Sequence, residues 1–143
     1  MATINTYLGF MGNTEKAFNF YRSVFDVDFV GGIRRFGDMP NNELMSEADK
    51  QKVMHVGLQI GPGNLLMGTD ALESMGQSLI FGNNFHISIS PESKEEAIKL
   101  FNGLSSGGTV TSPLKDTFWG AYFGAFTDKF GVQWMVNYLQ KVD

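Results

Sequence analysis

The chain has 143 residues, of which 43% are hydrophobic and 18% are charged, so it is long enough to bury one core and short for two average domains. It contains no cysteine, which excludes disulfides, thiolate zinc sites and cysteine nucleophiles, and only two histidines are available to a metal. The formal charge of −4, without a basic cluster, argues against a nucleic-acid partner. We expect a cytoplasmic protein with neither a signal peptide nor a membrane span.

Residues 1–70 carry the pattern of a strand, one helix and three further strands. The helix is expected to begin at Asn13 or Thr14, because either residue can cap it and apolar residues then recur at helical spacing. The polar residues 37–51 predict a connection with a helical turn near 43–48. The four strands are expected at residues 4–10, 27–36, 52–60 and 64–70, the second interrupted by a Gly-Gly pair.

Residues 84–143 repeat this order after a linker of small and polar residues at 71–83. Ser93 and Glu96 match the capping-box pattern at the start of a helix, and a Gly-Gly pair at 107–108 ends it. The strands of this half are expected at residues 85–90, 109–117, 119–127 and 131–139.

A comparison of the two halves supports an internal duplication. An offset of 80 residues aligns the apolar stripes of the two helices and places Ala17 on Ala97. Near the ends of the halves, Met67 and Met135 each follow a turn glycine by four residues. The sequence therefore predicts an α+β fold in which two βαβββ modules form mixed sheets around a shared cleft. We expect a single domain over 1–143, with module 1 at about 1–70, the linker at 71–83 and module 2 at about 84–143.

Alternation along the strands predicts which side chains face the cleft. Ile87 and Ile89 are expected against the helix, which leaves His86 and Ser88 toward the cleft. The offset of 80 pairs His86 with Thr6, so Thr6 and its neighbour at i+2 are expected to point inward as well. A few polar groups among methionines and aromatic residues are typical of a small-molecule site. The candidate ligand-binding residues are Thr6, Leu8, His55, Gln59, Met67, His86, Ser88, Trp119 and Met135.

Four segments carry a resemblance to a known family. They are YLGFMGNTEKAFNFY (7–21), RRFGDMP (34–40), VMHVGLQIGPGNLLMGTD (53–70) and DTFWGAYFGAFTDKFGVQWMVN (116–137). Together with the duplication they resemble the PhnB-like branch of the vicinal oxygen chelate superfamily, the glyoxalase/bleomycin-resistance/dioxygenase group, over essentially the whole chain. The resemblance implies a bacterial protein that forms homodimers. Relatives often carry a demethylubiquinone methyltransferase label, but this chain has no glycine-rich strand-to-helix loop for a methyl donor's nucleotide.

The resemblance also implies where a metal would be held. Metal-using relatives place four ligands near the start of the first strand and on the last strand of each half, which here correspond to Thr6, Met67, His86 and Met135. Only His86 offers a usable donor, because a thioether binds hard and borderline divalent cations poorly. We therefore expect no catalytic metal and no other cofactor. The two methionines either fill the space of the ion or grip an apolar ligand.

Three hypotheses about function follow. The first is a metal-free protein of PhnB-like type that binds an unidentified small molecule, and the second is a metal-dependent lyase, isomerase or dioxygenase, so whether the chain is an enzyme stays open. The third is a resistance protein that sequesters an antibiotic. Trp119 is either a core anchor or a stacking surface for a planar ligand. Arg34 and Arg35 are the sole adjacent basic pair, and no arginine cluster typical of a phosphate site is apparent.

Overall fold

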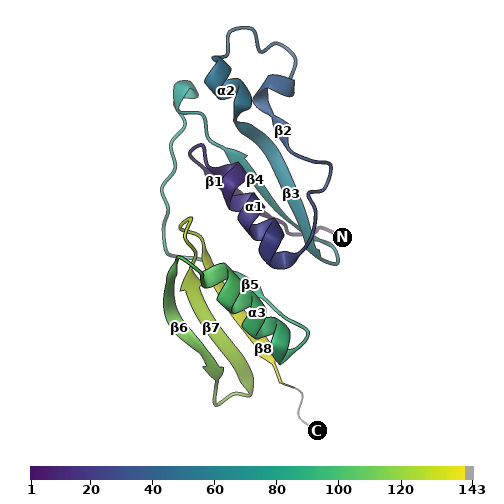
Figure 1. Cartoon of the computed structure of the whole chain (residues 1–143), viewed down its shortest axis with the longest axis vertical. Helices are drawn as coiled ribbons and strands as arrows, with labels where there is room; N and C mark the ends of the chain where they lie inside the picture. The colour runs from purple at the N-terminus through teal and green to yellow at the C-terminus, as the bar shows by residue number, and fades with distance from the viewer. Residues whose placement is uncertain (141–143) are drawn as a thin grey trace. The chain divides into compact units, whose positions relative to one another are not determined.

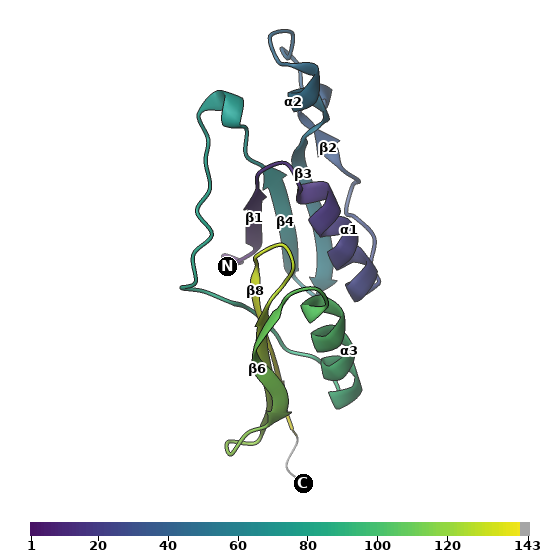
Figure 2. The ribbon, with the colours of Figure 1, turned by 60° about the vertical axis from the view of Figure 1, so that its left-hand side comes forward.

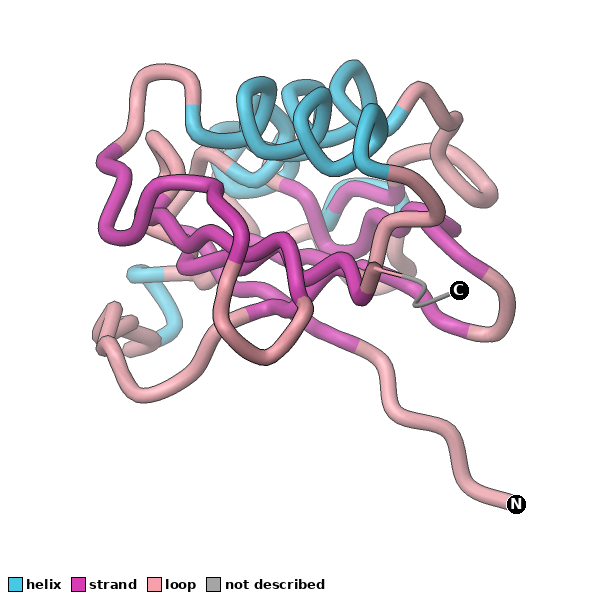
Figure 3. The backbone as a smooth tube through the Cα atoms, turned by 90° about the horizontal axis from the view of Figure 1, so that it is seen from below, coloured by secondary structure: helices cyan, strands magenta, loops and turns pink. Residues whose placement is uncertain are grey.

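The computed structural model describes residues 1–140 and divides into two compact units, Met1–Ile80 and Phe81–Asp143 (Figure 1). Each unit contains one four-stranded mixed sheet with a twelve-residue helix lying over one of its faces (Figure 3). Within the described residues, no helix has the length and apolar character that crossing a membrane requires. The predicted α+β fold of two βαβββ modules is confirmed.

The first unit has the strand order β1-β4-β3-β2, in which β1 runs parallel to β4 and the other neighbours are antiparallel. Its strands are β1 (Thr6–Phe10), β2 (Arg34–Arg35), β3 (Val53–Gly61) and β4 (Asn64–Asp70). Its helices are α1 (Thr14–Phe25) and α2 (Glu47–Gln51), with single 3-10 turns η1 (Phe36–Asp38) and η2 (Glu73–Met75).

The helix α1 packs closely on β4 because the sheet presents a glycine there. Ala17, Phe18 and Tyr21 are fully buried on the inner side of the helix. A side chain at Gly68 would overlap the ring of Phe18, so this position needs glycine for the close approach of helix and sheet. The apolar stripe at helical spacing thus sets which face of α1 meets the sheet.

The carboxylate of Asp70 ties the start of α1 to the ends of β3 and β4. Its Oδ1 accepts hydrogen bonds from the backbone N–H groups of Gly12 and Thr14, both at 3.1 Å, and from the Thr14 hydroxyl at 2.6 Å. Its Oδ2 accepts from the Val53 N–H at 2.8 Å. All four donors are at least 17 residues away from Asp70 in the sequence. Both oxygens of this buried carboxylate therefore accept hydrogen bonds from within the unit, and Asp70 has a structural role.

The second unit repeats the arrangement with the strand order β5-β8-β7-β6. Its helix α3 (Lys94–Ser105) begins after Ser93, whose Oγ accepts from the Glu96 N–H at 3.0 Å. The Phe101 ring meets Phe126 of the sheet edge-on, with 5.2 Å between ring centroids. The strands are β5 (Ile87–Ile89), β6 (Thr109–Asp116), β7 (Ala121–Thr127) and β8 (Gln133–Leu139).

Two expected elements of the first unit differ clearly from the structure. The strand predicted at 27–36 shrinks to β2, with one isolated bridge between Phe29 and Leu58, because Gly31 and Gly32 adopt φ values of 75° and 74° that break the extended chain. The helical turn expected near 43–48 is α2, which starts later because the Ser46 hydroxyl caps it by accepting from Asp49 N–H.

Candidate functional site

Each sheet has one face covered by its helix and one face turned away from it, which we call the open face. In the first unit, the pairing registers place Tyr7 beside Met67 and Met67 beside Gly57. Residues paired across neighbouring strands share a face, and the next residues along β3 and β4, Leu58 and Gly68, lie on the helix side. Tyr7, Gly57 and Met67 therefore form part of the open face.

Thr6 and Leu8 do not lie on this open face, contrary to expectation. They pair with Leu66 and Gly68, both on the helix side, and Leu8 is only 7% exposed. The link between β1 and α1 is one residue longer than its counterpart in the second unit. The residues of β1 therefore lie on the opposite faces from those that the comparison with the second unit predicted. The residue of β1 that takes the predicted place on the open face is Tyr7.

Tyr7 and His55 meet across this face. The Tyr7 Oη lies 3.0 Å from the His55 Nδ1, and the two ring centroids are 5.7 Å apart. The Nε2 of His55 lies 3.8 Å, and the Met67 Cγ 3.6 Å, from the point that a side-chain carbon at Gly57 would occupy. The structure therefore brings the predicted residues His55 and Met67 together, and it adds Tyr7 to them.

Gln59 is also on β3, but its side chain serves the adjacent turn. Its Nε2 donates to the Asn64 carbonyl at 3.0 Å and to the Gly61 carbonyl. The amide thus closes the hairpin between β3 and β4, which uses its hydrogen-bonding capacity locally.

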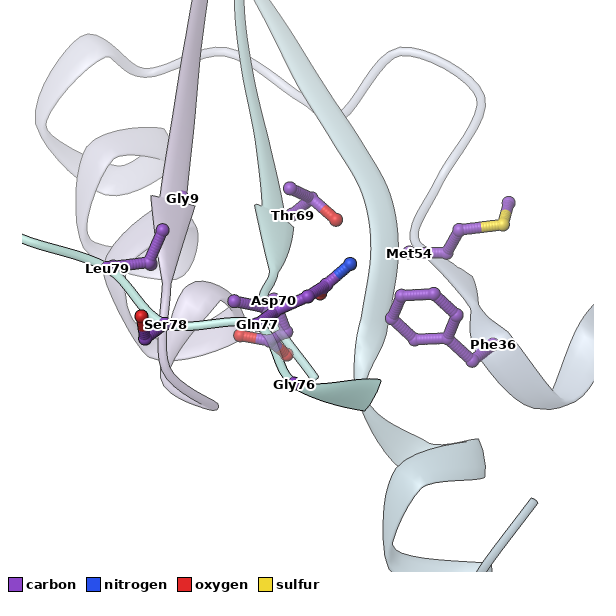
Figure 4. Close-up of a pocket in the computed structure, with 10 residues that line it drawn as sticks. Gly9, Phe36, Met54, Thr69, Asp70, Gly76, Gln77, Ser78 and Leu79 are labelled. Atoms are coloured by element: carbon purple, nitrogen blue, oxygen red, sulfur yellow. The ribbon is translucent and has the colours of Figure 1, made fainter. Parts of the chain in front are cut away.

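A pocket of about 670 Å³ continues from this cluster along the open face (Figure 4). The strap, residues 76–79, forms its outer wall, and the chain there runs on the side of β1 away from α1 (Figure 2). The Leu79 side chain occupies the space beside Gly9, where a side-chain carbon would lie only 3.3 Å from its Cδ1. The Gln77 Oε1 accepts from the Leu72 N–H at 2.7 Å. The Gln77 amide nitrogen points into the pocket between Thr69 and Phe36 (Figure 4). The lining residues are Gly9, Phe36, Met54, Thr69, Asp70, Ala71, Gly76, Gln77, Ser78 and Leu79.

Sequence reasoning missed the strap because it was assigned to the linker. Its small and polar composition gave no periodic signal, and the volume it encloses exists only once the chain is folded back over β1. A signal was present in β1, because Gly9 lies inside the strand, without a side chain, at the position against which Leu79 packs.

The base of the strap is anchored to α2 through Asp49. The Ser74 hydroxyl donates to the Asp49 Oδ2, and the Lys52 ammonium lies 3.0 Å from its Oδ1. These contacts, the Ser74 hydrogen bond first, hold the pKa of the Asp49 carboxyl below its ordinary value. The turn η2 is thereby fixed next to α2.

The second unit has a matching open face. Ser88 pairs with Met135, and Met135 pairs with Ala125, while the alternate positions of β7 and β8 pack toward α3. His86 is exposed one residue before β5, in phase with Ser88. This part of the strand alternation was predicted correctly.

Trp119 lies in the turn before β7 rather than on the strand predicted at 119–127. It is 56% exposed, its ring meets Phe118 at 4.9 Å between centroids, and Phe123 of the open face is 6.4 Å away. Phe123 pairs with Asn137, whose buried Oδ1 has no hydrogen-bond partner among the described residues. An exposed aromatic cluster therefore adjoins this open face.

Met67 and Met135 hold equivalent positions in the two units. Each lies on the strand that comes last along the chain in its unit. Its neighbour on the first strand is Tyr7 in one unit and Ser88 in the other. Tyr7 and Ser88 are 81 positions apart, so the counterpart of His86 is Asn5 rather than Thr6. The Asn5 Oδ1 accepts from the Leu65 N–H at 2.9 Å.

The donor set at these positions does not fit a catalytic divalent metal. Two are thioethers and one is a neutral amide engaged with the backbone, which leaves a single imidazole. Over residues 1–140, no group of three or more His, Cys, Asp or Glu side chains is placed to hold an ion.

The sequence and the fold match a known family. Residues 3–136 match the Glyoxalase/Bleomycin resistance protein/Dioxygenase superfamily, so the chain belongs to this superfamily, as the resemblance predicted. The chain is 28% identical over 146 residues to protein YjdN of Escherichia coli (strain K12), with 96% of each chain covered.

Solved structures agree. Protein PA1353 from Pseudomonas aeruginosa has a TM-score of 0.85 at 38% identity, covering 99% of this chain and 100% of that one. A PhnB protein from Bacillus cereus has a TM-score of 0.74 at 28% identity, covering 96% and 99%.

Proposed function

We propose that this chain is a small-molecule-binding member of the PhnB-like branch that works without a catalytic metal. The observation that carries the proposal is the equivalence of Met67 and Met135. Superfamily members that use a metal hold it with nitrogen and oxygen donors, whereas both equivalent positions here carry a soft thioether that binds Mg²⁺, Mn²⁺, Ni²⁺ or Zn²⁺ weakly.

The pocket of the first unit supports a binding role. Its volume of about 670 Å³ is in the range of small-molecule sites. Its walls combine apolar side chains such as Met54, Phe36 and Leu79 with the polar groups of Thr69 and Gln77. A few directed polar groups on an apolar wall are the usual composition of a site that orients one organic ligand.

The test is elemental analysis of the purified protein, followed by calorimetric titration with Ni²⁺, Mn²⁺ and Zn²⁺. We expect substoichiometric metal and no saturable site tighter than about 0.1 mM, because only one ordinary ligand is available. A stoichiometric ion with a tight titration would favour the second hypothesis, a metal-dependent lyase, isomerase or dioxygenase. Screening the metal-free protein against organic compounds by native mass spectrometry then tests the binding role directly.

A further inference from the structure

The adjacent Arg34 and Arg35 have separate roles. The guanidinium of Arg35 makes a two-pronged ion pair with Glu15 of α1, at 3.0 and 3.1 Å, and also donates to the Gln51 carbonyl at 2.8 Å. Arg34 instead lies opposite His55 on the neighbouring strand β3. The register of the β2–β3 strand pair shifts between the two arginines. Arg35 is therefore used to fasten β2 to the helix, while Arg34 stands on the open face beside His55.

Arg34 has no acidic partner among residues 1–140. The chain carries a net charge of −4, so an unpaired guanidinium opposite His55 is a local exception to the charge of the whole chain. A guanidinium presents a planar set of N–H donors that fits a carboxylate in two-pronged geometry. Its surroundings therefore favour an anionic group over a neutral or cationic one.

His55 supplies a second donor on the same face. When the Tyr7 phenol donates to Nδ1, the neutral imidazole carries its proton on Nε2. That nitrogen lies over Gly57, which carries no side chain of its own, and next to the Met67 side chain. The Tyr7 contact thus orients the ring so that an Nε2–H group is available to an acceptor placed beside Arg34.

The pocket adjoins this pair of donors. Gly9 and Thr69, which line it, are each two residues along the same face from Tyr7 and Met67. A ligand whose charged end meets Arg34 can therefore place an apolar body along Met67 toward the pocket walls.

We propose that the first unit binds an organic carboxylate with an apolar body, whose carboxylate is paired with Arg34 and accepts from the His55 Nε2–H group. The assignment rests on the proposed function and names the class of ligand for its first unit. Tyr7 is a positioning residue, since it acts through His55.

The test uses the eight methionines as probes. Metal-free protein with ¹³C-labelled methionine methyl groups is titrated with benzoate and with its neutral counterpart benzamide, and the shifts are followed by NMR. We expect benzoate to shift the Met67 and Met54 methyl signals, and benzamide to bind at least about tenfold more weakly, because it lacks the charge that Arg34 recognises.

Two variants make the test specific. R34Q is expected to weaken benzoate binding about tenfold or more. K16Q removes the same charge from the exposed side of α1 and is expected to leave the affinity unchanged. The remaining methionine signals report in the same spectra whether each variant is folded.

The contrary outcomes are distinct. Equal affinity for benzoate and benzamide, insensitivity to R34Q, or the absence of any shift at Met67 would overturn the carboxylate assignment and leave the metal-free binding function standing. Benzoate binding that appears only with added Zn²⁺ or Ni²⁺ and vanishes with a chelator would instead overturn the proposed function.

Discussion

The Tyr7 Oη lies 3.0 Å from the His55 Nδ1, and this contact connects β1 to β3 over the strand between them. It fixes the orientation of an imidazole that stands next to Met67 on the open face. The hydrogen bond is exposed, so its main consequence is the orientation of the ring and its contribution to stability is small.

The Tyr7→Phe substitution tests this orientation. It is expected to lower the free energy of unfolding by about 1 kcal/mol or less, and to change the ¹⁵N shifts of the His55 ring because Nδ1 loses its partner. Tyr138→Phe is the matched control, since the Tyr138 hydroxyl makes no hydrogen bond within the described part of the chain. A His55 spectrum that is identical in wild type and Tyr7→Phe would show that the contact does not set the ring.

The packing of α1 on β4 predicts a strong effect at Gly68. Gly68→Ala places a methyl group inside the Phe18 ring and is expected to destabilise the first unit by about 1–3 kcal/mol or more in urea unfolding. Gly61→Ala is the control within the same sheet, because nothing lies within 4 Å of the added carbon. If the two variants were equally stable, α1 would not approach the sheet at Gly68.

The anchor of the strap predicts a pH effect at Asp49. Because the pKa of its carboxyl is lower in the folded chain than in the unfolded one, ionised Asp49 adds stability above its ordinary pKa of 3.8, and this stability is lost as the pH falls through the lowered pKa. Ser74→Ala removes the largest cause of the shift, so it should raise the Asp49 pKa toward 3.8, measured by NMR titration of the carboxyl carbon. Ser78→Ala, on the same segment, should leave it unchanged; an unaltered Asp49 pKa in Ser74→Ala would refute the anchor.

Most of the fold could be predicted from local patterns. The two long helices, α1 and α3, and six of the eight strands follow from the alternation and spacing of apolar residues. β2 could not be predicted in length, because its end depends on the positive φ angles of Gly31 and Gly32 rather than on hydrophobicity. The strand at 119–127 was extended over Trp119 because its alternation continues into the turn.

The faces on which the candidate residues lie were predicted in part. Met67, His55, Ser88 and Met135 fall on open faces as expected, since alternation within a strand is a local property. Thr6 and Leu8 were assigned to the wrong face. The offset of 80 that aligns Ala17 with Ala97 in the helices was applied to the first strands as well, whereas those strands are offset by 81. A single extra residue in a turn reverses the faces of a strand, and only the pairing with β4 reveals it. The roles of Arg34 and the strap depend on contacts between distant segments, which the sequence does not show.

A Mn²⁺ titration of the methionine-labelled protein tests most directly whether Met67 and Met135 lie at positions that hold no metal. Paramagnetic broadening falls steeply with distance, so an ion bound beside either methionine would erase the methyl signal of that residue first. We predict that one equivalent of Mn²⁺ leaves the Met67 and Met135 signals as sharp as those of the other methionines. Selective loss of either signal at that ratio would contradict a metal-free site.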